Sequence, residues 1–328
     1  MGRASVSNSS TGDSRRLEWP TLLVLAGTYG AFGLLTWFHA SLPWWLLLPL
    51  GAYTVCLHGS LQHEAVHGHP TSRTWLNEAL VLPSLWLWMP YRIYRETHLR
   101  HHHDELLTDP TLDPESYYVT PERWAALGPS HRSLLWARNT LLGRLALGPA
   151  ICTWGLFRNE AVGLLRADGR HLGSWALHLI GCALVLAWVI GICGMPVLEY
   201  LAFFAYPGLS LTLLRSFLEH QARDNPGERS VLVEAGPAMS LLFLNNNLHA
   251  LHHDQPGLAW YRLPTRYRTR RSDLLAANGG YRYSGYLEIA ARYLLWPKEP
   301  LAHPGRLGPA PTPFPTAATA PETHKSTA

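Results

Sequence analysis

Long uncharged apolar stretches limit the fold of this chain of 328 residues more than any other feature. Residues 19–38 contain no charged side chain and have the length, about 20 residues, that lets a helix cross a hydrocarbon core of about 30 Å. Three further apolar stretches follow at residues 44–56, 175–193 and 195–214, the last with Glu199 near its start. Together they predict four membrane-spanning helices arranged as two hairpins.

Two other apolar runs are interrupted. Residues 76–89 contain Glu78 and Pro83, and residues 134–157 contain two arginines and a break at residues 148–149. We expect both runs to form helices at or just inside the membrane interface. Buried helices of a soluble protein are the alternative, but only 15 % of the residues are charged, against an average of about 25 %.

The distribution of arginine predicts the orientation in the membrane. Cytoplasmic flanks of membrane proteins carry an excess of Arg and Lys. The two expected hairpin tips, residues 39–43 and 194–196, contain neither, whereas the segment between the hairpins and the region after residue 214 are rich in Arg. Both termini and all the histidine-bearing segments are therefore expected on the cytoplasmic side.

The terminal segments differ in composition from the rest of the chain. Residues 1–17 are rich in Ser, Gly and Arg, and residues 300–328 in Pro, Ala and Thr, which predicts two disordered tails. No cleavable signal peptide is expected, because the first apolar stretch has full span length and lacks a small-residue cleavage pattern after it. The net charge of +4 is too small to indicate a nucleic-acid partner.

Ten of the 18 histidines fall in three tight clusters. His63 and His67 in the first cluster are four residues apart, which places them on one face of a helix. The other two clusters share a His-x-x-His-His spacing that aligns three imidazoles on one stripe, namely His98, His101 and His102, and His249, His252 and His253. A solvated or buried histidine group would explain any one cluster alone, but three clusters together indicate a metal site.

The number of imidazoles indicates more than one ion. A catalytic zinc takes three protein ligands and a structural zinc four, whereas the clusters offer eight. Imidazole suits iron, zinc, copper and nickel alike, so the ligand type does not name the metal. A pair of redox metals beside lipid favours attack on an unactivated C–H bond, which acid–base chemistry of side chains cannot perform.

This arrangement resembles the membrane fatty acid desaturase and hydroxylase superfamily. Residues 108–110 (TDP), 245–249 (NNNLH) and 256–264 (PGLAWYRLP) are similar to its bacterial fatty acid desaturase branch. The resemblance implies an all-α integral membrane protein, with a desaturase-like domain at residues 18–299. Four transmembrane helices would lie in two hairpins beneath a cytosolic helical cap, in a bacterial inner membrane.

The resemblance also implies a di-iron site with nine ligands. These are His63, His67, His98, His101, His102, His220, His249, His252 and His253. His103 is the alternative to His102, because three consecutive histidines allow either register. Where acyl-CoA members of the family have Asn one helical turn before the isolated histidine, this chain has Ser216.

Other residues are expected to support the ligands rather than bind metal. Glu64 and Asp254 directly follow ligand histidines, and Asp104 follows His103, so each could accept a ring N–H and fix the tautomer. Asn245 and His103 are expected in the same surrounding layer. No catalytic residue beyond the metal centre is predicted.

The resemblance implies an O2-dependent oxidoreductase that acts on a lipid or acyl substrate, most simply a desaturase. A hydroxylase or ketolase with a lipid, alkane or carotenoid substrate is the alternative. Electrons would come from a separate ferredoxin or cytochrome-like donor and its reductase, because this chain contains no Cys-x-x-Cys or haem-binding segment. The Arg-rich stretch 262–271 could dock an acidic donor, or serve as a membrane anchor.

One motif permits a different function. His63-Glu64-x-x-His67 is also the signature of zinc proteases, in which Glu acts as general base. This interpretation leaves the two His-x-x-His-His clusters unexplained. A metal carrier is disfavoured as well, because the expected spans contain almost no polar residue that could form a pathway.

Overall fold

The computed structural model describes residues 17–304, apart from the side chain of Asp104. Most of the two expected tails therefore lies outside the described residues. The chain is mostly helical, and its only strands within the described part are β1 (Leu232–Val233) and β2 (Arg282–Tyr283), which pair in parallel. The predicted helical class is confirmed, with this short strand pair as an addition.

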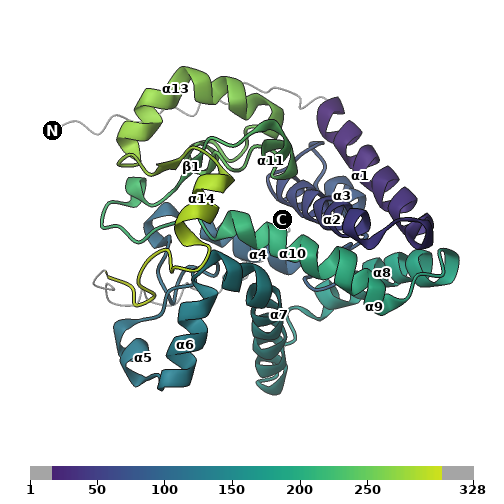
Figure 1. The fold of residues 1–328 in the computed structure, drawn as a ribbon, viewed down its shortest axis with the longest axis horizontal. Coiled ribbons are helices and arrows are strands. Elements are labelled where there is room, and N and C mark those ends of the chain that lie inside the picture. Colours follow the sequence, from purple (N-terminus) through teal and green to yellow (C-terminus); the bar gives the residue numbers. More distant parts are fainter. Residues whose placement is uncertain (1–16, 305–328) are drawn as a thin grey trace, which may run out of the picture.

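Two long hairpins form the apolar part of the molecule. The first consists of α1 (Trp19–Trp37) and α2 (Trp44–Val66), joined by the short η1 (His39–Ser41). The second runs through α8 (Leu172–Leu186) and η3 (Ala187–Ile192), then returns through α9 (Val197–Tyr200), η4 (Leu201–Ala205) and α10 (Tyr206–Ser216). In Figure 1, α1, α2, α8 and α9 lie to the right of α4 and α14, while α10 extends leftwards across α4.

Three described helical stretches are long and apolar enough to cross a membrane: Trp19–Trp37, Leu172–Ile192 and Val197–Ser216. The expected second span lies in α2, whose last turns carry polar residues such as Gln62 and Glu64 and lower its mean hydropathy. A fourth candidate exists only if α6 (Pro129–Arg138) and α7 (Leu141–Leu165), bent by 110°, count as one span. The chain is thus a membrane protein, while the four-span topology stays a prediction.

Glycines bring α2 against the second hairpin. A Cβ atom on Gly208 of α10 would lie 2.5 Å from Cβ of Val55, and one on Gly51 would lie 2.6 Å from the carbonyl oxygen of Phe203. Side chains larger than hydrogen at these two positions would force the backbones apart. The buried rings of Tyr200 and Phe204 pack beside this contact.

The two interrupted apolar runs differ from the prediction. Only α3 (Thr74–Leu80) is helical in the first run, and turns follow up to Pro90. In the second run the break lies at Asn139 and Thr140, where Thr140 caps α7, and α7 continues through Pro149. The ring of Pro149 leaves the carbonyl of Leu145 without its helical donor, and the hydroxyl of Ser210 donates to it at 2.8 Å.

The remaining elements lie outside the two hairpins, and we call them the cap, while their placement on the cytosolic side stays a prediction. They are α4 (Tyr91–His101), η2 (Asp104–Leu106), α5 (Pro121–Ala126), η5 (Pro226–Glu228), α11 (Pro237–Leu242), α12 (His249–Asp254), η6 (Trp260–Arg262), α13 (Leu263–Ala277) and α14 (Tyr286–Tyr293). The segment expected to begin the disordered C-terminal tail belongs here in part, because Val119 forms a β-bridge with Ala302.

Candidate metal centre

All nine predicted histidines converge in two neighbouring groups. The first group contains His63, His67, His98, His102 and His252, and the second contains His101, His220, His249 and His253. Within each group, one ring nitrogen per residue lies within 4.8 Å of all the others. Rings of the two groups are in contact, since the centroids of His102 and His253 are 4.3 Å apart.

Helix ends bring eight of these rings together. α2 carries His63 and ends beside His67, α4 carries His98 and His101 and ends beside His102, and α12 carries the third cluster. His220 comes from the segment that follows α10, where it forms an isolated bridge with Ser230. His103 is exposed and belongs to neither group, so the His102 register is the one that the structure brings into the site.

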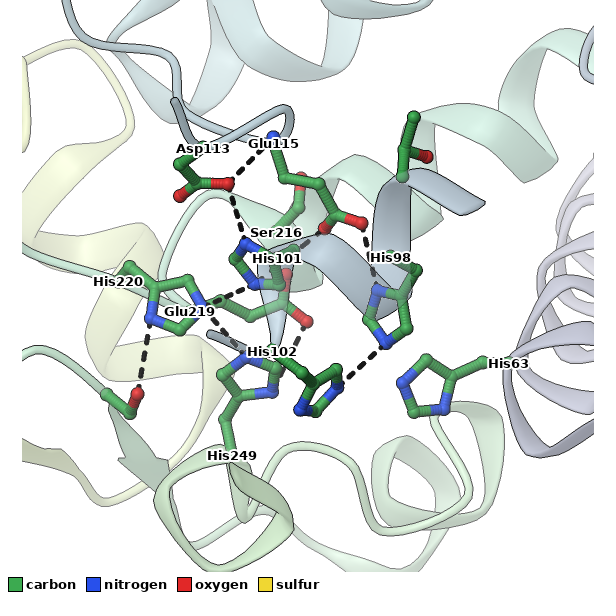
Figure 2. A network of polar contacts seen from close by, with 12 residues as sticks. His63, His98, His101, His102, Asp113, Glu115, Ser216, Glu219, His220 and His249 are labelled. Carbon is green, nitrogen blue, oxygen red and sulfur yellow. Dashed lines mark hydrogen bonds and ion pairs between the residues drawn. The ribbon is translucent and has the colours of Figure 1, made fainter. Parts of the chain in front are cut away.

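The Nε2 atoms face one another at short range. In the first group, Nε2 of His98 lies 3.1 Å from that of His67 and 3.0 Å from that of His102. In the second group, Nε2 of His220 lies 2.9 Å from that of His101 and 3.0 Å from that of His249 (Figure 2).

Carboxylates outside the two histidine groups contact the Nδ1 atoms of two rings. Nδ1 of His98 lies 2.9 Å from Oε1 of Glu115, and Nδ1 of His101 lies 2.8 Å from Oδ1 of Asp113 (Figure 2). Asp113 is fixed in turn, because the backbone N–H of Thr108 donates to its other oxygen at 2.8 Å. A carboxylate at Nδ1 places the proton there and turns the Nε2 lone pair inward.

The donor set therefore fits metal cations. Inward lone pairs at about 3 Å repel one another unless a cation lies between them. Burial lowers the pKa of His220, His249 and His252 well below the usual range, so these rings are neutral, the form that binds metal. Burial alone would lower the pKa of His101, but Glu115 and Asp113 outweigh it and raise that pKa to about 9, and the same pairing lowers the pKa of Glu115. His101 would therefore give up a proton on binding a metal.

The predicted supporting residues contact other partners. Glu64 accepts a hydrogen bond from the backbone N–H of Trp260 at 3.2 Å, and the side-chain amide of Asn245 donates to the carbonyl of Trp260 at 3.0 Å. Asp254 forms an ion pair with Arg270. The side chain of Asp104 lies outside the described part.

Sequence reasoning missed the residues that do engage the rings. Asp113 and Glu115 lie in a loop after α4, where no periodicity marks them. Asn246, rather than the predicted Asn245, contacts the rings of His63 and His249. The three consecutive asparagines did not indicate which of them would contact a histidine. Glu219 lies 3.6 Å from Nδ1 of His249 and pairs with Arg215, while Ser216 accepts a hydrogen bond from Arg144 at 3.3 Å.

A known protein family matches the region of the chain that contains the whole site. The family model described as Fatty acid desaturase matches residues 36–285, about three quarters of the chain, with all nine histidines inside. The chain belongs to the fatty acid desaturase family. No curated protein matches the chain.

Membership of the fatty acid desaturase family confirms the resemblance at the level of the superfamily and makes the protein a desaturase- or hydroxylase-type oxidoreductase. The bacterial branch stays a prediction. The matched region ends just after β2, so α14 and the residues that follow it lie beyond it.

Proposed function

We propose that this desaturase-family protein is an O2-dependent di-iron enzyme that introduces a double bond into a lipid acyl chain. The observation that carries the proposal is the pair of adjacent histidine groups, in each of which one ring nitrogen per residue lies within 4.8 Å of all the others. The overall reaction would take one O2, two electrons and two protons, remove two hydrogens from adjacent carbons and release two waters.

The residues that would hold the irons follow from the two groups. Five imidazoles would bind the first ion and four the second. When bound, such a pair supplies the oxidising power needed to break an unactivated C–H bond. Nine histidines exceed the three or four ligands of one zinc, which supports a two-ion site.

The chain itself would orient the ligands and exclude water. Asp113 and Glu115 fix the tautomers of His101 and His98. Tyr94 packs against His98 with ring centroids 5.5 Å apart, and Trp86 packs against Tyr94 at 6.3 Å. We expect this aromatic wall to keep bulk water from the reacting carbon.

A zinc protease is not supported by the geometry around Glu64. Its carboxylate is engaged by the N–H of Trp260, and the motif histidines His63 and His67 share their group with three further imidazoles. A general base would need a water between itself and a three-ligand zinc.

The orientation and the partners belong to the same proposal. We expect the metal centre and both termini to face the cytoplasm of a bacterial cell, with electrons delivered by a separate ferredoxin or cytochrome-like protein and its reductase. Of the arginines in the stretch 262–271, Arg270 and Arg271 form ion pairs with Asp254 and Glu234, whereas Arg266 and Arg268 are exposed and available for an acidic donor.

Metal analysis of the detergent-purified protein, combined with mass spectrometry of lipids from the expressing cells, tests this proposal. We expect two irons per chain and lipids lighter by two hydrogens. Lipids heavier by one oxygen would replace the desaturase by a hydroxylase, and a ketone product would indicate a ketolase. One zinc with unchanged lipids would overturn the proposal.

A further inference from the structure

His220 is the one member of the two groups that no helix positions. The other eight histidines lie on α2, α4 and α12 or at the residue that ends α2 or α4. His220 lies four residues after the end of α10, in a segment whose local pairing is a single bridge with Ser230. Contacts from other parts of the chain must therefore fix its backbone.

Two side chains converge on the carbonyl oxygen of His220. Nζ of Lys298 donates to it at 2.5 Å, and the hydroxyl of Tyr117 donates to it at 3.2 Å. The residues on either side are held in the same way. Tyr281 donates to the carbonyl of Leu218 at 2.7 Å, and Tyr118 accepts from the N–H of Ala222 at 2.8 Å.

Lys298 is a buried cation with a complete set of partners. Its side chain is 3 % exposed, and its Nζ also lies 2.8 Å from Oε1 of Glu299 and 3.3 Å from the hydroxyl of Tyr281. The hydroxyl of Tyr117 shares its single proton between the His220 carbonyl and Oε1 of Glu299, which lies 2.5 Å away, so one carboxylate contacts both donors of the His220 carbonyl. A buried charge is costly unless it is paired. The partners of Lys298 supply that pairing, so this residue is not an ordinary solvent-exposed lysine.

The segment that carries Lys298 is fastened to the cap at several points. We call residues 294–304 the C-terminal strap. The backbone N–H of Lys298 donates to the carbonyl of Asn139 at 3.0 Å, and Val119 pairs with Leu301 and His303 at 2.9 Å each. The strap lies outside the region matched by the family model, which ends at residue 285.

We propose that Lys298 is a positioning residue for His220, and that the C-terminal strap thereby sets the metal affinity of the second group. This inference rests on the proposed function, since it requires a metal at that group. The ring of His220 meets His101 and His249 at 2.9 and 3.0 Å, so a small shift of its backbone would spoil the ligand geometry of this group and leave the first group intact.

Cobalt(II) binding to the apoprotein tests the proposal without relying on activity. The double variant Lys298→Met, Glu299→Gln removes the ammonium without leaving its carboxylate buried and unpaired. His220→Ala and His63→Ala serve as references for loss of the second and the first site. Arg292→Met is the matched control, because this cation lies close by in α14, is 57 % exposed and pairs with Glu288.

We expect the wild type and Arg292→Met to bind two cobalt ions. The double variant should bind the first ion with unchanged affinity and the second about 10- to 100-fold more weakly, with the absorption spectrum of its one-cobalt form matching that of His220→Ala. Tyr117→Phe, which removes the other donor, should weaken the second ion alone by a smaller factor. Circular dichroism will report the helical content of each variant.

Two cobalt ions bound to the double variant with wild-type affinities would overturn the positioning role of Lys298 while leaving the proposed function intact. Equal weakening of both ions would also overturn it, because it would mean a general loss of stability. A wild-type chain that binds no cobalt would overturn the proposed function, and this inference with it.

Discussion

The side-chain oxygen of Asn246 lies 3.0 Å from Nδ1 of His249, a ring of the second group. The amide nitrogen of the same side chain lies 3.2 Å from Nε2 of His63, a ring of the first group. Asn246 is buried and thus ties the two groups to each other. Most of the other polar contacts around the rings serve only one group.

Replacement of Asn246 by Ala should therefore disturb both metal sites. We expect activity to fall by about 10- to 100-fold, together with weaker binding of both ions. Metal content and turnover of the purified variant measure this. Asn245→Gly is the control, because Asn245 contacts Trp260 and has a φ of 58°, which glycine adopts freely. Equal effects of the two substitutions would refute the linking role of Asn246.

Glu115→Gln tests the carboxylate that fixes His98. The substitution keeps the shape of the side chain but removes the charge that holds the proton on Nδ1. Turnover should fall by about 10- to 100-fold while the fold is retained. Glu105→Gln changes an exposed glutamate of η2 and should leave turnover unchanged. A variant Glu115→Gln with wild-type turnover would rule out this role.

Glu64→Gln separates the oxidoreductase from the protease. Because Glu64 accepts from the N–H of Trp260, a function that the amide oxygen of Gln can keep, we expect less than about a tenfold loss of lipid oxidation. A zinc protease would lose its general base and all activity. Complete loss of lipid oxidation with metal retained would contradict the assignment of Glu64 as a structural residue.

Acid should loosen the cap through Glu234. Arg271 donates to this carboxylate at 2.6 Å and Arg282 at 2.5 Å, and the hydrogen bond from Arg271 is the main reason why the pKa falls from 4.5 to about 2. A carboxyl whose pKa is lower in the folded state adds stability above its unfolded pKa and loses it as the pH falls.

Thermal unfolding of the protein between pH 5 and pH 2 measures this contribution, the range being set by the two pKa values. Glu234→Gln should lower the midpoint temperature at pH 5 and reduce its dependence on pH, whereas the exposed Glu122→Gln should behave as the wild type. Parallel pH profiles for Glu234→Gln and the wild type would exclude the contribution.

Electron delivery should depend on the exposed arginines of α13. Replacing Arg266 and Arg268 by Gln should raise the KM for an acidic donor several-fold at low salt and leave the metal content unchanged. The difference should vanish at high ionic strength, where surface charges are screened. Steady-state rates at several salt concentrations measure this, and salt-independent rates in the wild type would remove donor docking at this surface.

The ligand histidines could be predicted because a helix repeats every 3.6 residues. Spacings of three and four residues indicated which of the eight clustered rings share a face, whereas the ninth, His220, was expected only from the resemblance to the family, and the structure brings all nine together. Asp113 and Glu115 could not be predicted, since they reach the rings from a loop whose path depends on tertiary contacts. Lys298 was hidden for a similar reason, because nothing local marks a lysine that bonds to a carbonyl 78 positions away.

Membrane-spanning helices could be predicted only where the sequence is apolar over the full length of a span. The first stretch and the second hairpin stand out by their apolar length. The proline in α7 misled us, because the sequence does not reveal that Ser210 of another helix supplies the missing donor to Leu145.

The close packing of α2 against the second hairpin at Gly51 and Gly208 affects how the protein would respond to changes in the bilayer. α2 ends at the first histidine cluster and α10 leads to His220, so each group is anchored to one of two helices whose backbones touch. A membrane that thickens or thins makes its helices tilt. If α2 and α10 both span the membrane as predicted, we expect them to tilt together, which would keep the spacing of the two groups constant when lipid composition or temperature changes.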